Sequence, residues 1–418
     1  MRVIARRSEI KGMVEAPKSK SFTHRALIAA ALAHGKSTIM HPLASEDTEV
    51  TTDLLKALGI EIEDRGRLWV VNGGELMEPK RDLFCKESGT SLRLATALCT
   101  LVKGKCKITG APGLLKRPIG ELVNALRQLG ADCTANGDFP PVITNNSFIG
   151  GSAFLRGDVS SQFVSALLFV SPLGGKTTTI RLSTPLESAP YVRMTLSTMK
   201  SFGVDVVASE GLARFDIEQQ RYKTQTYEVE GDWSSASFLL AGGAMAGSAA
   251  VSGLDTKSTQ ADVAMLDILY RMGADISIRG DTIITSRSTL HAINYDVSNC
   301  PDVFPILAAM CSVAEGKSTI SGIRRLAMKE SDRVAEMGRG LANMGIGFKK
   351  NSDSIEITGG KPKGSVIYAN DHRIAMAFGV LGLVADKATV IENAECVGKS
   401  FPDFWERLRQ LNCDIGVE

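Results

Sequence analysis

The chain has 418 residues, of which 44% are hydrophobic and 22% charged, a composition typical of globular proteins and not of disordered ones. Its formal net charge of +2 gives no whole-molecule field of the kind found in nucleic-acid-binding or membrane-surface proteins. The eight cysteines are scattered without a CxxC pair, which disfavours a zinc site or a disulfide framework and favours a reducing cytoplasm. The apolar runs are shorter than the roughly 20 residues that a bilayer requires.

A passage of about 70 residues recurs six times along the chain. Each copy has a polar cluster, an apolar run of 13 residues that reads as a helix, a landmark residue and a short β-rich string. Successive landmarks are 69, 71, 72, 69 and 70 residues apart. They are Gly35, Gly104, Gly175, Gly247, Gly316 and Asp386. Since such repeats usually bury a shared core against their neighbours, the period predicts six related α/β subdomains.

In the first copy, residues 22–34 predict a buried helix, because Ala and Leu favour helix and apolar side chains cover most of its circumference. Residues 37–40 follow as a strand, 46–58 as an amphipathic helix, and 60–62 as a half-buried strand. The first helices of the later copies are expected at 91–103, 162–174, 234–246, 303–315 and 373–385.

The second helix of each copy is expected to end at Gly or Asn, which tolerate a left-handed helix end. These ends are Gly59, Gly130, Gly203, Gly273, Gly345 and Asn412. Polar, extended segments at 15–18 and 227–231 indicate domain boundaries. A division there into two lobes of three copies each is the natural one.

Polar clusters with anion-binding character lie at one position of the repeat, the start of the apolar helix. A helix N-terminus presents unpaired N–H groups and about half a positive charge, so it attracts phosphate or carboxylate. The clusters are 18–21 with Arg25, 87–90 with Arg93, 160–162 and 370–373, and further cations before the second helices are Lys116, Arg117, Lys329, Arg333 and Lys399. Taken singly, each cluster is better explained by ordinary helix capping and solvated surface charge than by an anion site. Their equivalent positions in related units favour anion sites.

Two of these clusters contain carboxylates whose role the residues leave open. Asp302 stands at a helix start, where it can be a cap or a general base. Glu330, between Lys329 and Arg333, can be a salt-bridged structural acid or a proton donor. The fourth helix start, residues 232–234, has no ligand role that the sequence assigns.

The motifs PKSKS with a following Arg, SGT, KRPIG, SSQ, PD, KESDR, NDHR and GKSFP occur in this order over essentially the whole chain. In this combination the chain resembles the 5-enolpyruvylshikimate-3-phosphate synthase family. The resemblance implies an α/β (α+β) fold, a two-lobed inside-out α/β barrel built from six repeats of a small βαβαββ-like unit. It further implies crossovers near residues 16–20 and 227–231. They would join a lobe of residues 19–229, with repeats one to three, to a lobe of residues 1–18 plus 230–418, with repeats four to six. The resemblance also implies closure of the lobes on their ligands.

The activity implied by the resemblance is transfer of the enolpyruvyl group of phosphoenolpyruvate to the 5-hydroxyl of shikimate 3-phosphate, with release of phosphate. This is a step of the shikimate pathway toward chorismate and the aromatic amino acids. The expected partners are the two small-molecule substrates, with no metal, organic cofactor, nucleic acid or membrane. A monomeric, cytoplasmic enzyme is expected.

Carried over residue by residue, the resemblance implies three overlapping sets of site residues. The shikimate-3-phosphate set is Lys20, Ser21, Arg25, Ser160, Ser161, Gln162, Ser188, Asp302 and Lys329, with Tyr191 nearby. The phosphoenolpyruvate set is Lys20, Gly89, Arg117, Gln162, Arg333, Arg373 and Lys399. The catalytic set is Asp302 as acceptor of the 5-hydroxyl proton, Glu330 as proton donor to the methylene carbon, Lys20 and His372. The reaction needs two opposed proton-transfer groups, and cations where phosphate leaves.

Three positions depart from the family pattern. Glu87 stands where many members carry Asn, and an acid there should weaken anion binding unless Arg117 or Lys20 neutralises it. Leu94 stands where Pro is frequent, and Arg325 replaces an Asn or an acid that often contacts shikimate. These differences bear on inhibitor sensitivity more than on the reaction.

Alternative functions are weighed against this interpretation. The sister enzyme that transfers enolpyruvyl to UDP-N-acetylglucosamine typically carries a cysteine in the loop before its Arg-Pro, where this chain reads GAPGLLKRP, with Pro112. A non-catalytic anion-binding repeat scaffold would need the cationic clusters but not Asp302 and Glu330 together. An RNA-phosphate cyclase is disfavoured because no basic stretch with interleaved aromatic residues occurs.

Overall fold

The computed structural model describes all 418 residues, which form twelve α-helices and six four-stranded sheets. The chain divides into two compact units, Lys18–Val229 and Met1–Pro17 with Glu230–Glu418. Each unit contains three of the sheets, and each sheet belongs to one copy of the repeat. None of the helices combines the length and the apolar character that a membrane span requires.

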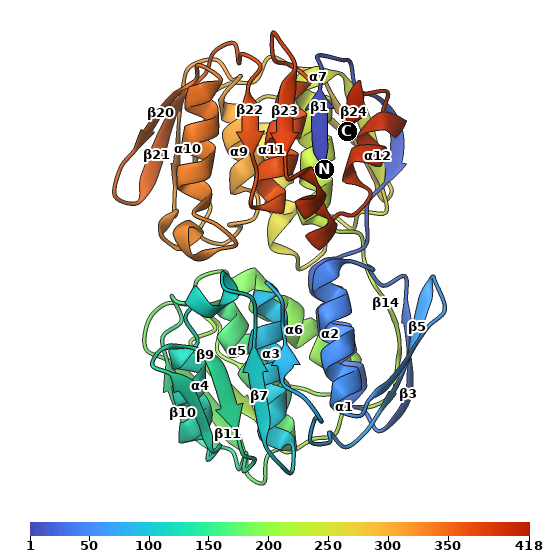
Figure 1. The fold of residues 1–418 in the computed structure, drawn as a ribbon, viewed down its shortest axis with the longest axis vertical. Coiled ribbons are helices and arrows are strands. Elements are labelled where there is room, and N and C mark those ends of the chain that lie inside the picture. Colours follow the sequence, from blue (N-terminus) through green and yellow to red (C-terminus); the bar gives the residue numbers. More distant parts are fainter. The chain divides into compact units, whose positions relative to one another are not determined.

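The third copy contains every element of the repeating unit in unbroken chain order, and Figure 1 labels its helices and its first two strands. It consists of β10 (Gly151–Leu155), α5 (Ser161–Val170), β11 (Thr178–Leu182), α6 (Ala189–Ser201), β12 (Val207–Ala208) and β13 (Arg214–Ile217). β10 pairs parallel with β11, and β13 pairs antiparallel with both β11 and β12. The same sequence of one parallel and two antiparallel pairings runs across every sheet. This confirms the expected α/β fold.

The unit Lys18–Val229 is completed by a strand from its C-terminal end. The first copy has α1 (Lys20–Leu32), β3 (Gly35–Met40), α2 (Glu46–Ala57), β4 (Glu61–Asp64) and β5 (Leu68–Gly73). The second has β6 (Leu83–Phe84), α3 (Gly89–Leu98), β7 (Cys106–Thr109), α4 (Gly120–Gln128), β8 (Cys133–Asn136) and β9 (Phe139–Thr144). β14 (Thr226–Glu228) pairs parallel with β3 and supplies the strand that the first copy lacks.

The other unit is completed from the N-terminus of the chain. Its elements are α7 (Trp233–Ala246), β15 (Ser248–Ser252), α8 (Ala264–Arg271), β16 (Asp275–Arg279), β17 (Thr282–Ser286), β18 (Asn294–Asp296), α9 (Phe304–Cys311), β19 (Lys317–Ser321), α10 (Arg333–Asn343), β20 (Gly347–Lys350), β21 (Ser354–Thr358), β22 (Val366–Tyr368), α11 (His372–Gly382), β23 (Thr389–Glu392), α12 (Phe404–Gln410) and β24 (Ile415–Val417). β1 (Arg2–Ala5) lies between β23 and β24, and β2 (Lys11–Glu15) pairs parallel with β15. One N-terminal segment thus completes two sheets.

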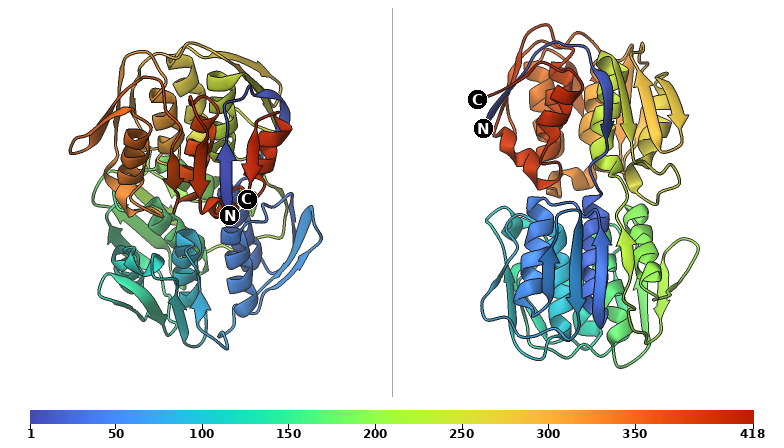
Figure 2. Two further views of the ribbon diagram at one scale, coloured as in Figure 1. Left: turned by 45° about the horizontal axis from the view of Figure 1, so that its top comes forward. Right: turned by 90° about the vertical axis from the view of Figure 1, so that its right-hand side faces the viewer.

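The first helix of each copy is buried, and the second is amphipathic. In the unit that contains them, α7, α9 and α11 contact one another, and every residue of α9 and α11 is buried. Figure 2 shows the sheets of each unit around its helices. α10, by contrast, buries Val334, Met337 and Leu341 on one face. A helix that is apolar all round belongs in a core, and a helix with one apolar stripe belongs at its margin.

The landmark residues stand where each buried helix ends and its sheet begins. In each copy, the strand that continues the buried helix has one antiparallel neighbour in the sheet. Just after that neighbour, a main-chain N–H donates to a carbonyl near the end of the buried helix. The pairs are Gly74 to Ala31, Phe148 to Thr100, Gln220 to Pro172, Ser288 to Ala244, Gly360 to Ser312 and Ser8 to Leu383. Helix ends leave carbonyls unpaired, and this contact satisfies one of them in every copy. The same main-chain contact therefore ties the end of the buried helix to its sheet in every copy.

The predicted helix boundaries are right at the second helices and partly wrong at the first. The six predicted end residues all have positive φ, between 62° and 89°. However, α1 and α3 begin two residues earlier than predicted, because Ser19 and Ser88 are the N-caps, accepting from the N–H groups of Phe22 and Ser91. The last turns predicted after α3 and α5 are 3₁₀-helices, η1 (Cys99–Leu101) and η3 (Ser171–Leu173).

The close approach of β5 to α1 yields a test with a matched control. A Cβ on Gly73 would lie 2.1 Å from the carbonyl oxygen of Ala30 and 2.2 Å from that of Ala33. Gly73→Ala is therefore expected to lower the free energy of unfolding by about 1–3 kcal/mol or more, because main-chain atoms must move. A Cβ on the neighbouring Gly74 meets nothing within 4 Å, so Gly74→Ala should change it by less than about 0.5 kcal/mol. Denaturant unfolding compares the two variants, and equal losses would refute the steric account.

Candidate active site

In the unit that holds residues 230–418, charged side chains converge at the starts of α10 and α11. Asp332 caps α10 by accepting from the N–H of Ala335, and Asp371 caps α11 by accepting from the N–H of Arg373. Arg333 is the first residue of α10 and is 1% exposed. Arg333 directly follows one cap and Arg373 stands two residues after the other, so the two caps fix the main chain from which both guanidinium groups extend.

Arg333 binds three carboxylates. Its Nε donates to Asp371 Oδ2 at 2.7 Å, its Nη1 to Asp302 Oδ1 at 2.7 Å, and its Nη2 to Glu330 Oε2 at 2.8 Å. Asp302 also accepts from Arg373 Nη2 at 3.0 Å and lies 3.7 Å from Lys329 Nζ. We call Asp302, Lys329, Glu330, Arg333, Asp371 and Arg373 the Asp302 cluster. It contains three carboxylates and three cations, so its formal charge is balanced.

The cluster keeps Asp302 ionised. Burial alone would raise the pKa of Asp302, but Arg373, Lys329 and Arg333 outweigh it and hold that pKa well below its usual range. Burial lowers the pKa of Lys329, against the attraction of Asp302. Burial would also lower the pKa of Arg333, but Asp371, Glu330 and Asp302 raise it well above its usual value. In this arrangement Asp302 is a carboxylate, and its basicity depends on how strongly Arg373, Lys329 and Arg333 lower its pKa.

The remaining predicted residues of this unit lie on nearby elements. His372 is the first residue of α11, is 1% exposed, and has its Nδ1 3.5 Å from Asp371 Oδ1. Lys399 is the last residue of the 3₁₀-helix η6 (Ala394–Lys399), which contacts α11. Lys329 follows the 3₁₀-helix η5 (Arg324–Met328).

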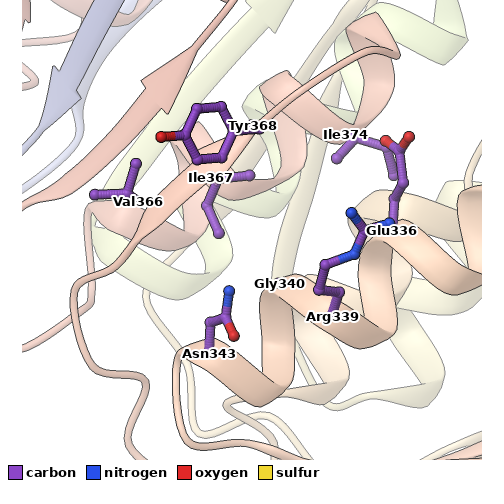
Figure 3. A pocket seen from close by; sticks show the side chains of 8 residues that line it. All are labelled: Glu336, Arg339, Gly340, Asn343, Val366, Ile367, Tyr368 and Ile374. Carbon is purple, nitrogen blue, oxygen red and sulfur yellow. The ribbon is translucent and has the colours of Figure 1, made fainter.

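A small pocket lies between α10 and the elements of the sixth copy (Figure 3). Glu336, Arg339, Gly340 and Asn343 line it from α10, and Val366, Ile367, Tyr368 and Ile374 line it from the sixth copy. Burial raises the pKa of Glu336, and the charge of Asp371 raises it further. Glu336 thus responds electrostatically to the same Asp371 that binds Arg333.

In the unit Lys18–Val229, the start of α1 carries two cations with different surroundings. Lys20, the first residue of α1, donates from Nζ to Asp47 Oδ2 at 2.9 Å. Arg25, which is 5% exposed, donates to Thr195 Oγ1 and to the main-chain oxygens of Ser21 and Tyr191, each at 2.9 Å. Burial lowers the pKa of Arg25 to about 10, so it remains a cation at neutral pH.

The bond from Lys20 to Asp47 gives a second testable prediction. Asp47→Asn removes the negative charge that holds Lys20 Nζ in place. The ammonium group should then be less well positioned, although it can still bind an anion. We expect kcat/KM to fall by about 10-fold, close to the lower end of the roughly 1.5–3 kcal/mol that hydrogen bonds to charged groups contribute. Asp53→Asn, an exposed change on the same helix, is the matched control. Steady-state kinetics compare them, and an unaltered kcat/KM in Asp47→Asn would exclude a positioning role for Asp47.

The starts of α3 and α5 bring hydroxyl and guanidinium groups to one surface. Ser160 caps α5, Ser161 begins it, and Gln162 donates from Nε2 to Thr90 Oγ1 at 2.9 Å. A Cβ on Gly89 would lie 2.2 Å from Arg93 Nη1 and 2.9 Å from Arg117 Nη1. A side chain at position 89 would therefore displace one or both guanidinium groups from this helix start.

Ser188 lies at the start of the next helix, α6. It has a positive φ of 56°, which a non-glycine residue adopts rarely, and it is 2% exposed. The left-handed turn at Ser188 immediately precedes α6, which also carries Thr195, a partner of Arg25. Tyr191, on the same helix, gives its carbonyl oxygen to Arg25.

The three departures from the family pattern have distinct surroundings. Glu87 Oε1 accepts from the main-chain N–H of Gly113 at 3.0 Å, in the loop before Arg117. Leu94 is 4% exposed and belongs to the core. Arg325 donates from Nη2 to the carbonyl oxygen of Ser298 at 2.8 Å.

The sequence interpretation missed three partners of its own site residues. Asp371, within the NDHR motif, reads as a helix cap, and only the fold shows its second bond to Arg333. Asp47 reads as one of several acids in the first turn of α2, and Thr195 carries no signal at all. Each partner lies at least 27 residues from the cation it binds, beyond the range of local patterns.

The chain is similar over its whole length to one group of known proteins. A family model described as EPSP synthase (3-phosphoshikimate 1-carboxyvinyltransferase) matches residues 4–408. A 3-phosphoshikimate 1-carboxyvinyltransferase of Dehalococcoides mccartyi is 40% identical over 403 residues, 96% of each chain, and one of Methanocorpusculum labreanum is 40% identical over 425 residues, 100% of each. The solved EPSP synthase from Acinetobacter baumannii has a TM-score of 0.84 at 27% identity, with both chains fully covered. The chain therefore belongs to the EPSP synthase (3-phosphoshikimate 1-carboxyvinyltransferase) family.

Proposed function

We propose that the Asp302 cluster and the helix starts of the unit Lys18–Val229 carry the family's reaction, each with a separate task. Family membership establishes enolpyruvyl transfer in the shikimate pathway, in which phosphoenolpyruvate is the donor and shikimate 3-phosphate the acceptor. The observation that carries the residue assignment is the pair Asp302 and Glu330, held by the same buried Arg333. An anion-binding scaffold would not need two carboxylates among its cations.

The unit Lys18–Val229 supplies donors suited to the phosphate and hydroxyl groups of the acceptor. Arg25 makes three bonds within the protein, which leaves two of its five N–H groups for a ligand. Ser21, Ser160, Ser161, Gln162 and Ser188 add hydroxyl and amide groups at helix starts, where the helix dipole favours anions. Lys20 is the cation of this set that also reaches the donor.

Phosphoenolpyruvate carries a phosphate and a carboxylate, both suited to forked binding by arginine. In the unit Lys18–Val229, Arg117 lies beside Gly89, whose lack of a side chain lets an anion approach the N–H groups of α3. In the other unit, Arg333 and Arg373 point into the Asp302 cluster, and Lys399 adds a third cation. Cations at the phosphate stabilise the charge that develops as it leaves.

The chemistry requires one group to take a proton and another to give one. Asp302 is the acceptor of the 5-hydroxyl proton, and Glu330 donates to the methylene carbon of the enolpyruvyl group. While Arg373 and Lys329 lower the pKa of Asp302, this carboxylate is a weak base. When those cations turn to the anionic substrates, its pKa rises and proton transfer becomes favourable. His372 lies beside Asp371, where it can orient the carboxylates of the cluster.

Phosphate release from phosphoenolpyruvate tests this function directly. Release is expected only when shikimate 3-phosphate is present, because attack by the 5-hydroxyl precedes loss of phosphate. UDP-N-acetylglucosamine in place of shikimate 3-phosphate is expected to give none. Turnover with the UDP-sugar alone would overturn the acceptor assignment, and release without any acceptor would overturn the transfer reaction.

The proposal includes a cytoplasmic, monomeric enzyme. Its eight cysteines are all unpaired, and seven are buried, which suits a reducing compartment. Sedimentation at increasing protein concentration tests the monomeric state, and a concentration-dependent mass would contradict it.

A further inference from the structure

The guanidinium group of Arg25 is held by groups of α1 and α6. Its Nε donates to Thr195 Oγ1 and its Nη2 to the carbonyl oxygen of Tyr191, each at 2.9 Å. Its Nη1 donates to the carbonyl oxygen of Ser21, also at 2.9 Å. Since Nε carries one N–H and each terminal nitrogen carries two, one N–H is left on Nη1 and one on Nη2. These are the two N–H groups that Arg25 can offer to an anion.

The contacts of Thr195 fix the direction of its hydroxyl. The residue lies within α6 and is 0% exposed. Its Oγ1 donates to Ser165 Oγ at 2.8 Å and lies 3.1 Å from the carbonyl oxygen of Tyr191, one turn earlier in α6. A β-branched side chain has few χ1 rotamers in a helix, and a bond to the preceding turn selects between those of threonine. Because arginine can only donate, the hydroxyl accepts from Arg25 and directs its own proton to one of the other two oxygens.

This hydroxyl joins three helices that contribute to the proposed acceptor site. Arg25 lies on α1, Ser165 on α5 and Thr195 on α6, and α6 contacts both of the other helices. The starts of these helices carry proposed ligands of shikimate 3-phosphate, which are Ser21, Ser161 and Ser188. The bond between Thr195 and Arg25 therefore connects the guanidinium to the helices that position the hydroxyl ligands.

We propose that Thr195 is a positioning residue of the acceptor site, whose hydroxyl fixes the rotation of the Arg25 guanidinium so that its two free N–H groups face the anionic acceptor. Without this hydroxyl, the Nε–H of an arginine that is 5% exposed has no acceptor, and the guanidinium turns to find one. Arg25 keeps its charge in either case, since its pKa is about 10. The inference rests on the proposed role of Arg25 and assigns Thr195 no contact with the substrate.

Thr195→Val tests this role, because it keeps the β-branched shape of the side chain and removes the hydroxyl. The dissociation constant of shikimate 3-phosphate, measured by calorimetry, should rise about tenfold, the effect of losing one hydrogen bond to a charged group. The KM for this substrate should rise by a similar factor, while kcat stays within about twofold of wild type, since ground state and transition state lose the same binding. Thr195→Ser restores the hydroxyl and should bring the affinity back to within about threefold of wild type.

Thr198→Val is the matched control. Thr198 is also 0% exposed, lies on the same helix, and donates from Oγ1 to the carbonyl oxygen of Met194 at 3.0 Å. Both variants lose a buried hydroxyl, so their free energies of unfolding should fall by similar amounts, but only Thr195→Val should lose affinity. Equal losses of affinity would assign the effect to the packing of α6 and overturn the inference.

Alanine substitutions keep the comparison possible if Thr195→Val does not fold. Thr195→Ala removes the same hydroxyl with a smaller side chain, and Thr198→Ala is then its control. The affinity for shikimate 3-phosphate should fall in Thr195→Ala and not in Thr198→Ala. An affinity that is the same in both variants would overturn the inference.

A double-variant cycle separates this inference from the proposed function. Arg25→Ala alone should weaken the binding of shikimate 3-phosphate, and adding Thr195→Val should weaken it no further, because the hydroxyl acts through the guanidinium. An effect of Thr195→Val that persists in Arg25→Ala would overturn the inference, as would unaltered affinity in Thr195→Val alone. Failure of the proposed function looks different, because wild-type affinity in Arg25→Ala would remove Arg25 itself from the acceptor site.

Discussion

Asp302→Asn is expected to remove most turnover while leaving the fold and the binding of shikimate 3-phosphate in place. Asparagine has nearly the same shape but cannot accept the 5-hydroxyl proton. Loss of a general base typically lowers the rate by about 10²–10⁴-fold. The measurement is kcat at substrate saturation, with shikimate 3-phosphate affinity measured separately by calorimetry.

The charges around Asp302 sharpen this prediction. Without the carboxylate, Arg333 and Arg373 lose one partner, so anion binding should hold or tighten while kcat falls. Asp414→Asn is the control, since Asp414 pairs with Arg6 on the exposed surface, where such pairs contribute little. If Asp302→Asn keeps kcat within about threefold of wild type, the base assignment is wrong.

Arg333→Ala is expected to produce the largest loss of stability among single changes at the site. It leaves Asp302, Glu330 and Asp371 close together without the guanidinium that joins them. Removing one partner from a buried ion pair costs about 3–5 kcal/mol, because the remaining charge stays desolvated. Arg333→Lys keeps the charge but cannot reach three carboxylates at once, so its loss should be intermediate. Denaturant unfolding measures both.

The pH dependence of this loss separates electrostatics from packing. In Arg333→Ala the three carboxylates repel one another, so their pKa values rise and protonation relieves the strain. The stability gap to wild type should therefore narrow as pH falls toward 4, near the ordinary range of these groups. Arg324→Ala is the matched control, because that arginine forms an exposed pair with Asp353. A gap that does not change with pH would assign the loss to packing alone.

The repeat and its helix ends could be read from the sequence because their causes are local. Gly59 and Asn412 end helices by adopting positive φ, a property of single residues. The apolar run of α11 predicts burial because it has no polar face. By contrast, the sequence predicts the start of α3 two residues too late. A glycine and a threonine in a polar cluster give no helical signal unless the cap at Ser88 is taken into account.

The pairing of strands in the sheets is harder to predict from the sequence than the positions of the helices. The strand beside β3 is β14, from the far end of its unit, and β1 lies between two strands from the C-terminal region. Local patterns indicate that a strand exists but not which strand it pairs with. Pairing across such separations is decided by the closure of the whole unit.

The sequence by itself determined the sixfold repeat, the α/β class, the motifs of the family and the helix starts that carry Arg333 and Arg373. These are properties of short segments, fixed by side-chain type and spacing. Asp302, expected at a helix start, instead lies in the turn before α9, whose N-cap is Val303. Only the tertiary structure decided that Arg333 binds three carboxylates and that Asp47 accepts a hydrogen bond from Lys20. Charge interactions depend on distance and on burial, and both arise when segments far apart in the chain pack together.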